Sequence, residues 1–192
     1  MDFIKGIRKY SPRIISGSAR GTKLFVPKEG TRPMADRVKS GLFSIIQNLI
    51  YKSNVLDLYA GTGALGIECL SRAAARATFV DNSRHALESI RKNLKRTGFS
   101  SLADIRHQRV GQYLKKHSNI NNFERFDIIF FSPPHKDFEK RYISRSAPLL
   151  KTDGILIAEH HKKTHVKVKL GELIKVDERV YGITMLSFFK RK

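Results

Sequence analysis

The 192-residue chain, 41% hydrophobic and 28% charged, has the size and composition of one globular domain with room for a small appendage. No apolar run approaches the roughly 18 residues that a membrane-spanning helix needs, and the single Cys69 excludes an internal disulfide, so we expect a cytoplasmic protein without membrane contact. Its 37 Lys and Arg residues against 17 Asp and Glu residues leave a formal net charge of +20, which favours a polyanionic partner such as RNA over a merely solvated surface.

Residues 1–50 have the pattern of a basic hairpin followed by a helix, an appendage ahead of a larger domain at 51–192. Short strands are predicted at 13–16 and 22–26, because the connection between them begins and ends with glycine. A helix is expected after Pro33, since apolar residues recur on one side of the segment that follows. The candidates for phosphate contact in this part are Arg20, Lys23, Arg32 and Arg37.

From residue 54 onward, short apolar strands alternate with amphipathic helices. Strands are predicted at 55–59, 77–80, 103–107, 126–131 and 155–158. Helices are predicted between them at 64–71, 84–97, 110–116 and 140–150. Repeated strand–helix units indicate an α/β fold with a parallel sheet covered by helices. The tail has little helix and suggests an antiparallel edge, with strands at 166–169, 174–178 and 185–189.

A glycine-rich turn follows the strand at 55–59. Gly61, Gly63 and Gly66 would let backbone N–H groups approach a ligand closely, and the helix start after them favours negative charge. The Gly-x-Gly-x-x-Gly spacing, with Asp81 at the end of the next strand, is compatible with a dinucleotide and with S-adenosylmethionine. A plain strand-to-helix turn is the third interpretation.

Asp57 favours S-adenosylmethionine over a dinucleotide. It lies late in the strand before the turn, where a carboxylate suits the ammonium group of a methionine moiety and would repel a pyrophosphate. Asp81 can accept hydrogen bonds from ribose hydroxyls. The candidate cofactor contacts are Asp57, Tyr59, Ala60, Gly61, Thr62, Gly63, Asp81 and Asn82.

The strand at 126–131 ends in the rigid segment Ser132-Pro133-Pro134-His135. This segment resembles the Asp-Pro-Pro-Tyr or Asn-Pro-Pro-Tyr motif of amino-directed methyltransferases. In that motif the first side chain and the first proline carbonyl accept hydrogen bonds from an exocyclic amine, and the fourth residue stacks on the base. By this resemblance Ser132 and the carbonyl of Pro133 are acceptors and His135 is the stacking group. A plain proline strand terminator is the alternative.

The resemblance extends over most of the chain. The segments that carry it are Arg13–Gly17, Arg20-Gly21, Thr31–Pro33, Asp36–Val38, Leu56–Glu68 and Tyr181–Leu186. Together they resemble the RsmD-type family of small-subunit ribosomal RNA guanine-N2 methyltransferases. The family's fold is a Rossmann-like class I S-adenosylmethionine-dependent methyltransferase, with a seven-stranded, mostly parallel sheet and an antiparallel last strand. The resemblance therefore implies that 51–192 is the methyltransferase catalytic domain and that ribosomal RNA or a small-subunit particle is the partner.

The sequence departs from the family with Met34 in place of Thr, Ser40 in place of Glu and Ser132 in place of Asp or Asn, and the family's acid or amide after the third strand is not obvious around Gln108–Gly111. Three hypotheses stay open at this stage. The first is an active guanine methyltransferase, the second is a catalytically weakened RNA-binding relative, and the third is an amine methyltransferase acting on DNA adenine. No metal site is expected, because the histidines at 160–165 lack zinc-ligand spacing, and a monomer is the default expectation.

Overall fold

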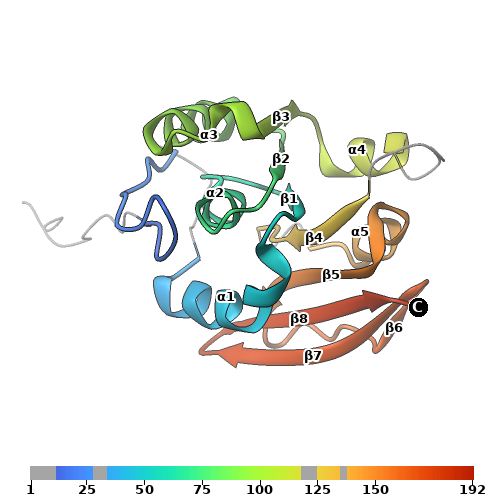
Figure 1. The fold of residues 1–192 in the computed structure, drawn as a ribbon. Coiled ribbons are helices and arrows are strands. Elements are labelled where there is room, and N and C mark those ends of the chain that lie inside the picture. Colours follow the sequence, from blue (N-terminus) through green and yellow to red (C-terminus); the bar gives the residue numbers. More distant parts are fainter. Residues whose placement is uncertain (1–11, 28–33, 118–124, 135–137) are drawn as a thin grey trace, which may run out of the picture.

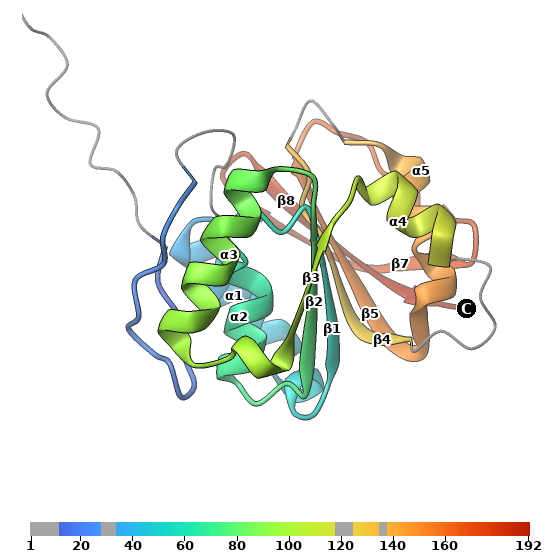
Figure 2. The same cartoon turned by 90° about the horizontal axis from the view of Figure 1, so that it is seen from above.

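A central sheet of eight strands organises the chain, and helices cover both of its faces (Figures 1 and 2). The computed structural model describes residues 12–27, 34–117, 125–134 and 138–192. The strands are β1 (Asn54–Leu58), β2 (Arg76–Asp81), β3 (Ala103–His107), β4 (Phe126–Phe131), β5 (Leu150–His161), β6 (Lys169–Leu170), β7 (Leu173–Tyr181) and β8 (Thr184–Arg191). The helices are α1 (Asp36–Ile50), α2 (Ala64–Ser71), α3 (Arg84–Thr97), α4 (Val110–His117) and α5 (Lys140–Arg145), with 3₁₀ turns at Ser100–Leu102 and Ala147–Leu149.

The strand order is β3-β2-β1-β4-β5-β8-β7-β6, and the first five of these strands are parallel. The chain moves from β1 outward to β3 and then returns to the other side of β1 with β4. In open parallel sheets, ligands bind outside the carboxyl ends of the strands where the order reverses. The topology therefore directs attention to the carboxyl ends of β1 and β4. The predicted α/β fold with a parallel sheet is confirmed.

The helices form two layers, with α1, α2 and α3 on one face of the sheet and α4 and α5 on the other (Figure 2). Each layer buries its own apolar cluster against the sheet. A close approach between helix and sheet lies at Gly66 of α2, where an added Cβ would be 2.4 Å from the ring of Phe79 on β2. A glycine is required there because no side chain fits between helix and strand. This contact fixes the start of α2 close to the sheet.

The antiparallel edge consists of the three strands β8, β7 and β6, and it makes the sheet one strand larger than the seven-stranded sheet that the family resemblance implied. β8 pairs antiparallel with both β5 and β7, which confirms the reversed last strand. The sheet has eight strands rather than seven, because Lys169 and Leu170 add β6 to the outer edge of β7. The expected strand at 166–169 shrinks to this pair, since Gly171 adopts a positive φ of 62° and turns the chain back into β7. None of the described helices is long and apolar enough to cross a membrane.

The N-terminal hairpin is present, but among the described residues it has one bridge, between Arg13 and Lys23, instead of two paired strands. The reason is that neighbouring backbone groups bond to the body of the protein. The N–H groups of Ile15 and Ser16 donate to Glu68, and the N–H of Phe25 donates to Asn93. The boundary at residue 50 stays a prediction, although hairpin residues Ile14 and Leu24 belong to the same apolar cluster as β1.

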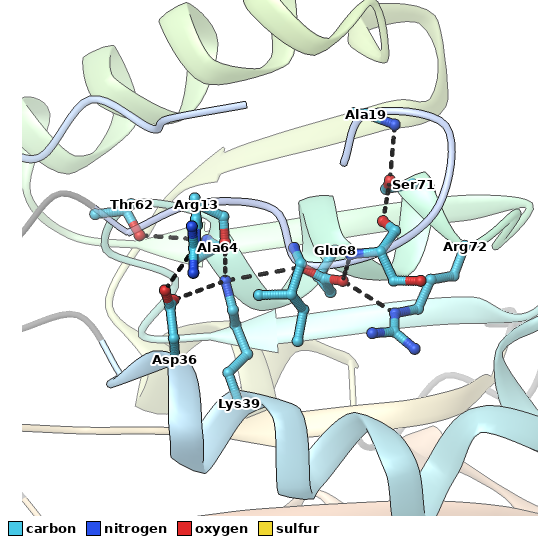
Figure 3. Close-up of polar contacts among 11 residues, drawn as sticks. Arg13, Ala19, Asp36, Lys39, Thr62, Ala64, Glu68, Ser71 and Arg72 are labelled. Carbon is cyan, nitrogen blue, oxygen red and sulfur yellow. Dashed lines mark hydrogen bonds and ion pairs between the residues drawn. The ribbon is translucent and has the colours of Figure 1, made fainter. Parts of the chain in front are cut away.

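Glu68 of α2 binds the hairpin to the body of the protein (Figure 3), and its side chain has no exposed surface. One carboxylate oxygen accepts hydrogen bonds from the Ser16 N–H and from Arg72 Nε, each at 3.0 Å. The other accepts the Ile15 N–H at 2.8 Å and lies 3.7 Å from Lys39 Nζ. A buried carboxylate is stable only when such partners replace water. Hairpin, α1 and α2 therefore meet at this one group.

Lys39 of α1 is the buried cation of the same cluster. Its ammonium donates to the carbonyl of Arg13 and lies 3.8 Å from Asp36. Burial lowers the pKa of Lys39, and the carboxylates of Glu68 and Asp36 oppose that shift. The lysine thus joins the first residue of the bridge to the first turn of α1.

Replacing Glu68 by Ala is predicted to destabilise the protein strongly. The change leaves Lys39 buried without its carboxylate and two backbone N–H groups without acceptors, a loss of about 3–5 kcal/mol by comparison with broken buried ion pairs. Urea unfolding measures the loss. Glu88→Ala, on the exposed face of α3, is the matched control and should stay within about 0.5 kcal/mol of the parent protein. Equal free energies of unfolding for the two variants would contradict this stabilising role of Glu68.

Candidate functional site

The turn after β1 carries most of the predicted cofactor contacts and bends sharply at its glycines. Gly61 and Gly63 have φ values of 55° and 74°, and Gly63 caps α2 in the left-handed conformation. Tyr59 also has a positive φ of 61°, an unusual value for a residue with a Cβ. Its ring packs edge-on against Phe131 of β4, with 5.4 Å between centroids. That contact holds the strained residue in place.

Asp81, at the end of β2, fastens this turn. Its carboxylate accepts the Gly61 N–H at 2.9 Å and the Ser83 N–H at 2.8 Å. A carboxylate has further lone pairs, so it can still accept hydrogen bonds from a ligand's hydroxyl groups. Asn82 follows and is exposed. The turn after β1 and the end of β2 thus lie together.

His107 is a neighbour of this cluster that the sequence analysis missed. Its Nε2 lies 3.1 Å from the carbonyl oxygen of Asn82, and the β2–β3 register pairs it with Asp81. The predicted strand ended at His107, so its position beside Asp81 follows from strand order alone. Without the strand order, nothing in the sequence marks His107 as a neighbour of Asp81.

Asp57 lies beneath the turn and is 2% exposed. Its carboxylate accepts the N–H of Gly66 at 3.0 Å. Burial raises the pKa of Asp57 from 3.8 to about 8, against the hydrogen bond from Gly66, and the nearby charge of Asp81 adds to the rise. The carboxyl group therefore holds a proton at neutral pH. A cation bound beside it would favour the ionised form.

The segment after β4 lies beside the turn after β1. The register pairs Leu58 with Phe131, and the Ser132 N–H donates to the carbonyl of Leu58 at 3.4 Å. Ser132 is half-buried, Pro133 is buried and Pro134 is exposed. Predicted catalytic and cofactor residues from distant parts of the sequence are thus brought together at one edge of the sheet. His135 lies outside the described residues.

Three aromatic side chains pack in a row next to the Ser132-Pro133 corner. The ring of Phe138 packs against Phe131 at 5.8 Å and against His160 at 5.3 Å, measured between centroids. Sequence reasoning missed Phe138, and its signal was only an aromatic residue shortly after the proline pair. His160 is 1% exposed and its Nε2 lies 2.9 Å from the Ser187 hydroxyl. It is a packed residue, and within the described segments no three His, Cys, Asp or Glu residues gather around a possible metal.

Asn93 of α3 links the hairpin to the turn after β1. This fully buried amide accepts the Phe25 N–H at 2.7 Å and donates to the Phe25 carbonyl at 3.0 Å. It also donates to the carbonyl of Thr62 at 2.9 Å. The sequence analysis did not identify it, although a polar residue on the apolar side of a helix, between Ile90 and Leu94, was a usable signal.

The predicted phosphate contacts do not form a single cluster. Arg20 and Lys23 are exposed on the hairpin and line one pocket together with Arg96 of α3. Arg37 is exposed in the first turn of α1 and is not among the lining residues. Arg32 lies outside the described residues.

The chain is similar to known proteins over nearly its whole length. Residues 12–190 match the family described as "Conserved hypothetical protein 95". The chain is 31% identical over 184 residues to "Putative rRNA methyltransferase YlbH" of Bacillus subtilis, covering 94% of this chain and 99% of that protein. It is 39% identical over 135 residues to "Ribosomal RNA small subunit methyltransferase D" of Haemophilus influenzae, covering 69% and 68%. The solved structure "Putative methyltransferase yhhF from Escherichia coli" has a TM-score of 0.81 at 28% identity, covering 95% and 99%. The predicted methyltransferase fold class is confirmed.

The raised pKa of Asp57 predicts a pH dependence of stability. Below pH 3.8 the carboxyl group is protonated in folded and unfolded chains alike. Between there and about pH 8 the unfolded chain ionises first, so the free energy of unfolding falls as the pH rises. Asp57→Asn is neutral at every pH and lacks this slope. Urea unfolding should therefore show the wild type losing stability relative to the variant by up to about 1.4 kcal/mol per pH unit. Parallel pH profiles would contradict the assignment.

Replacing Asn93 by Ala is predicted to loosen two distant segments together. The part-buried N–H of Phe25 and the buried carbonyl of Thr62 would both lose a partner, and the buried group would cost about 1–3 kcal/mol. Hydrogen exchange should become faster in both the hairpin and the turn at 59–63. Gln112→Ala, which removes an exposed amide from α4, is the control and should leave both segments unchanged. Faster exchange in the hairpin alone would disprove the link.

Proposed function

Because the chain belongs to the family described as "Conserved hypothetical protein 95", the RsmD-type family, we propose that it is a ribosomal RNA methyltransferase that uses S-adenosylmethionine and acts on the exocyclic N2 amine of a guanine in small-subunit RNA. One observation carries the proposal. The Ser132-Pro133 corner after β4 lies directly beside the turn after β1, through the hydrogen bond from Ser132 to Leu58. Cofactor and base would therefore meet at the edge where the strand order reverses.

The residues of the turn suit the cofactor. When bound, S-adenosylmethionine supplies a methyl group on a positively charged sulfur. Asp57 would ionise to bind the ammonium group of its methionine part, since a nearby cation offsets the effect of burial on the carboxyl pKa. Asp81 would accept hydrogen bonds from the ribose hydroxyls while it still holds the Gly61 N–H. Tyr59, Ala60, Thr62, Gly63 and Asn82 would complete the contacts.

The Ser132-Pro133 corner would orient the amine. The Ser132 hydroxyl and the Pro133 carbonyl would each accept one amine hydrogen, which turns the nitrogen lone pair toward the methyl carbon. The amine nitrogen would gain the methyl group that the cofactor supplies and would lose a proton to solvent. Both acceptors stabilise the positive charge that develops on the nitrogen. Pro134 keeps the corner rigid, and His135 is the proposed stacking group.

The basic residues would bind the RNA backbone. Arg20, Lys23 and Arg37 are exposed, and with Arg32 they are the proposed phosphate contacts of residues 1–50, while 51–192 would carry the catalysis. Binding should weaken with salt as counterions return to the phosphates. A cytoplasmic monomer that acts on ribosomal RNA or on a small-subunit particle is part of the proposal.

Ser132 supports a second candidate, a catalytically weakened RNA-binding relative. A serine hydroxyl is shorter and carries no charge, so it stabilises a developing cation less than the usual Asp. The two candidates share the fold and the RNA surface and differ in turnover.

Radiolabelled methyl transfer to undermethylated small-subunit particles tests the proposal, with label expected in guanine. Binding of the particles without incorporation would favour the second candidate, and label in adenine would overturn the choice of base. Naked ribosomal RNA, assayed in parallel, decides between the two forms of substrate.

Ser132→Asp is predicted to raise the rate of methyl transfer about tenfold, because a charged acceptor stabilises the transition state by roughly another 1.4 kcal/mol. Ser132→Ala, the matched loss of the hydroxyl, should lower the rate by at least about tenfold. Single-turnover kinetics with saturating RNA measures both. A slower Ser132→Asp enzyme would mean that the corner is built around a hydroxyl.

A further inference from the structure

A shallow pocket of about 580 Å³ lies on the outer surface, between the hairpin and the end of α3. Figures 1 and 2 show these two segments side by side. The pocket is lined by Arg20, Gly21, Thr22, Lys23 and Arg96. Three of the five lining residues are cationic and none is acidic. The lining of this pocket therefore favours an anionic ligand, at a place separate from the Ser132-Pro133 corner.

The three cations of this pocket lack carboxylate partners within the described segments. Other surface arginines have them: Arg106, for example, pairs with Asp104 at 2.6 Å, and Arg191 with Glu172 at 2.7 Å. Arg20, Lys23 and Arg96 form no ion pair among the described residues, and all three are exposed. Three like charges that converge without compensation favour an anion between them.

An aromatic ring borders the pocket. Side chains alternate along an extended segment, so Lys23 and Phe25 face outward on either side of Leu24, which is 2% exposed. Phe25 is 47% exposed, and the guanidinium of Arg96 lies over its ring at 5.0 Å from the centroid. An exposed aromatic beside unpaired cations is the combination with which proteins bind single-stranded nucleic acid, because bases stack on the ring and phosphates meet the cations.

We propose that this pocket binds one nucleotide of a single-stranded RNA segment flanking the target guanine. Arg20, Lys23 and Arg96 contact its phosphate, and its base stacks on Phe25. The inference rests on the proposed function for its RNA partner, and it adds Arg96 and Phe25 to the predicted contacts. A single strand is required because a base inside a duplex has no free face to offer the ring.

The pocket is coupled to the cofactor turn by hydrogen bonds between the backbone of both segments and the side chain of Asn93. The backbone N–H and the backbone carbonyl of Phe25 both form hydrogen bonds with the side-chain amide of Asn93. The same amide donates a hydrogen bond to the carbonyl of Thr62. A nucleotide on Phe25 is therefore held at a fixed position relative to the turn after β1. Such anchoring positions the rest of the RNA strand for reaction.

Fluorescence anisotropy with a labelled single-stranded RNA of about ten nucleotides, a site size typical of single-strand binding grooves, tests the proposal. Phe25→Ala should weaken binding by roughly fivefold to a hundredfold with an unchanged salt dependence, because it removes a stacking contact and no charge. Phe25→Tyr should restore the affinity. Arg96→Gln should weaken binding and reduce the slope of log K against log salt by about 0.7, the value for one phosphate of a single strand.

Lys115→Gln is the matched control, since it removes one exposed charge from α4 on the opposite face of the sheet. It should bind like the wild type. Wild-type affinity in both Phe25→Ala and Arg96→Gln would overturn the proposal, as would an equal loss in the control. Phe25→Ala should leave binding of a duplex RNA unchanged, and an equal loss there would exclude stacking.

Methyl transfer separates this inference from the proposed function. If the wild type methylates guanine and both variants keep its KM for RNA, the proposed role of the pocket is refuted and the proposed methyltransferase function is supported. If the variants bind RNA weakly but the wild type transfers no methyl group, the proposed role of the pocket is supported and the proposed methyltransferase function is refuted. Equal melting temperatures of all variants show that the fold is intact.

Discussion

A single buried carboxylate, Glu68, determines how the N-terminal segment is arranged against the sheet. Inside the protein every polar group needs a partner to replace water. Glu68 satisfies the N–H groups of Ile15 and Ser16 and balances the buried ammonium of Lys39. These demands are met only when hairpin, α1 and α2 take one relative position. The hairpin thus has a defined place although it contains almost no strand pairing of its own.

That placement matters because two further polar groups connect it to the site. Asn93 joins Phe25 of the hairpin to Thr62 of the turn, and Asp81 joins the same turn to the end of β2. The hairpin, the turn after β1 and the end of β2 are therefore parts of one hydrogen-bonded framework. A substrate gripped at the hairpin would be presented to the reacting corner without a separate closing motion.

In the proposed reaction, the chemistry of the site would depend on two side chains that are neutral when no ligand is bound. Burial keeps a proton on Asp57, and Ser132 has no charge to lose. An ammonium group and a developing ammonium-like nitrogen are the charges that would appear there in the proposed reaction. These two neutral side chains contrast with the exposed cations Arg20, Lys23 and Arg96 on the outer surface, so in the proposed reaction the RNA backbone would bind outside and the base at the strand ends.

The sequence alone determined the helices and strands of the sheet, since apolar periodicity and glycine turns are local. α2, α3, β3 and β4 have the predicted bounds, and Asp57, Asp81 and Ser132 were identified because each lies late in a strand, at its end or just after it. Only the tertiary structure decided the roles of Glu68, Asn93 and Phe138. On sequence Glu68 is equally a helix surface residue or a ligand, and nothing pairs Asn93 with residues 31 and 68 positions away. Their partners come from segments that meet only in the folded chain, and no local pattern encodes which buried polar groups will face one another.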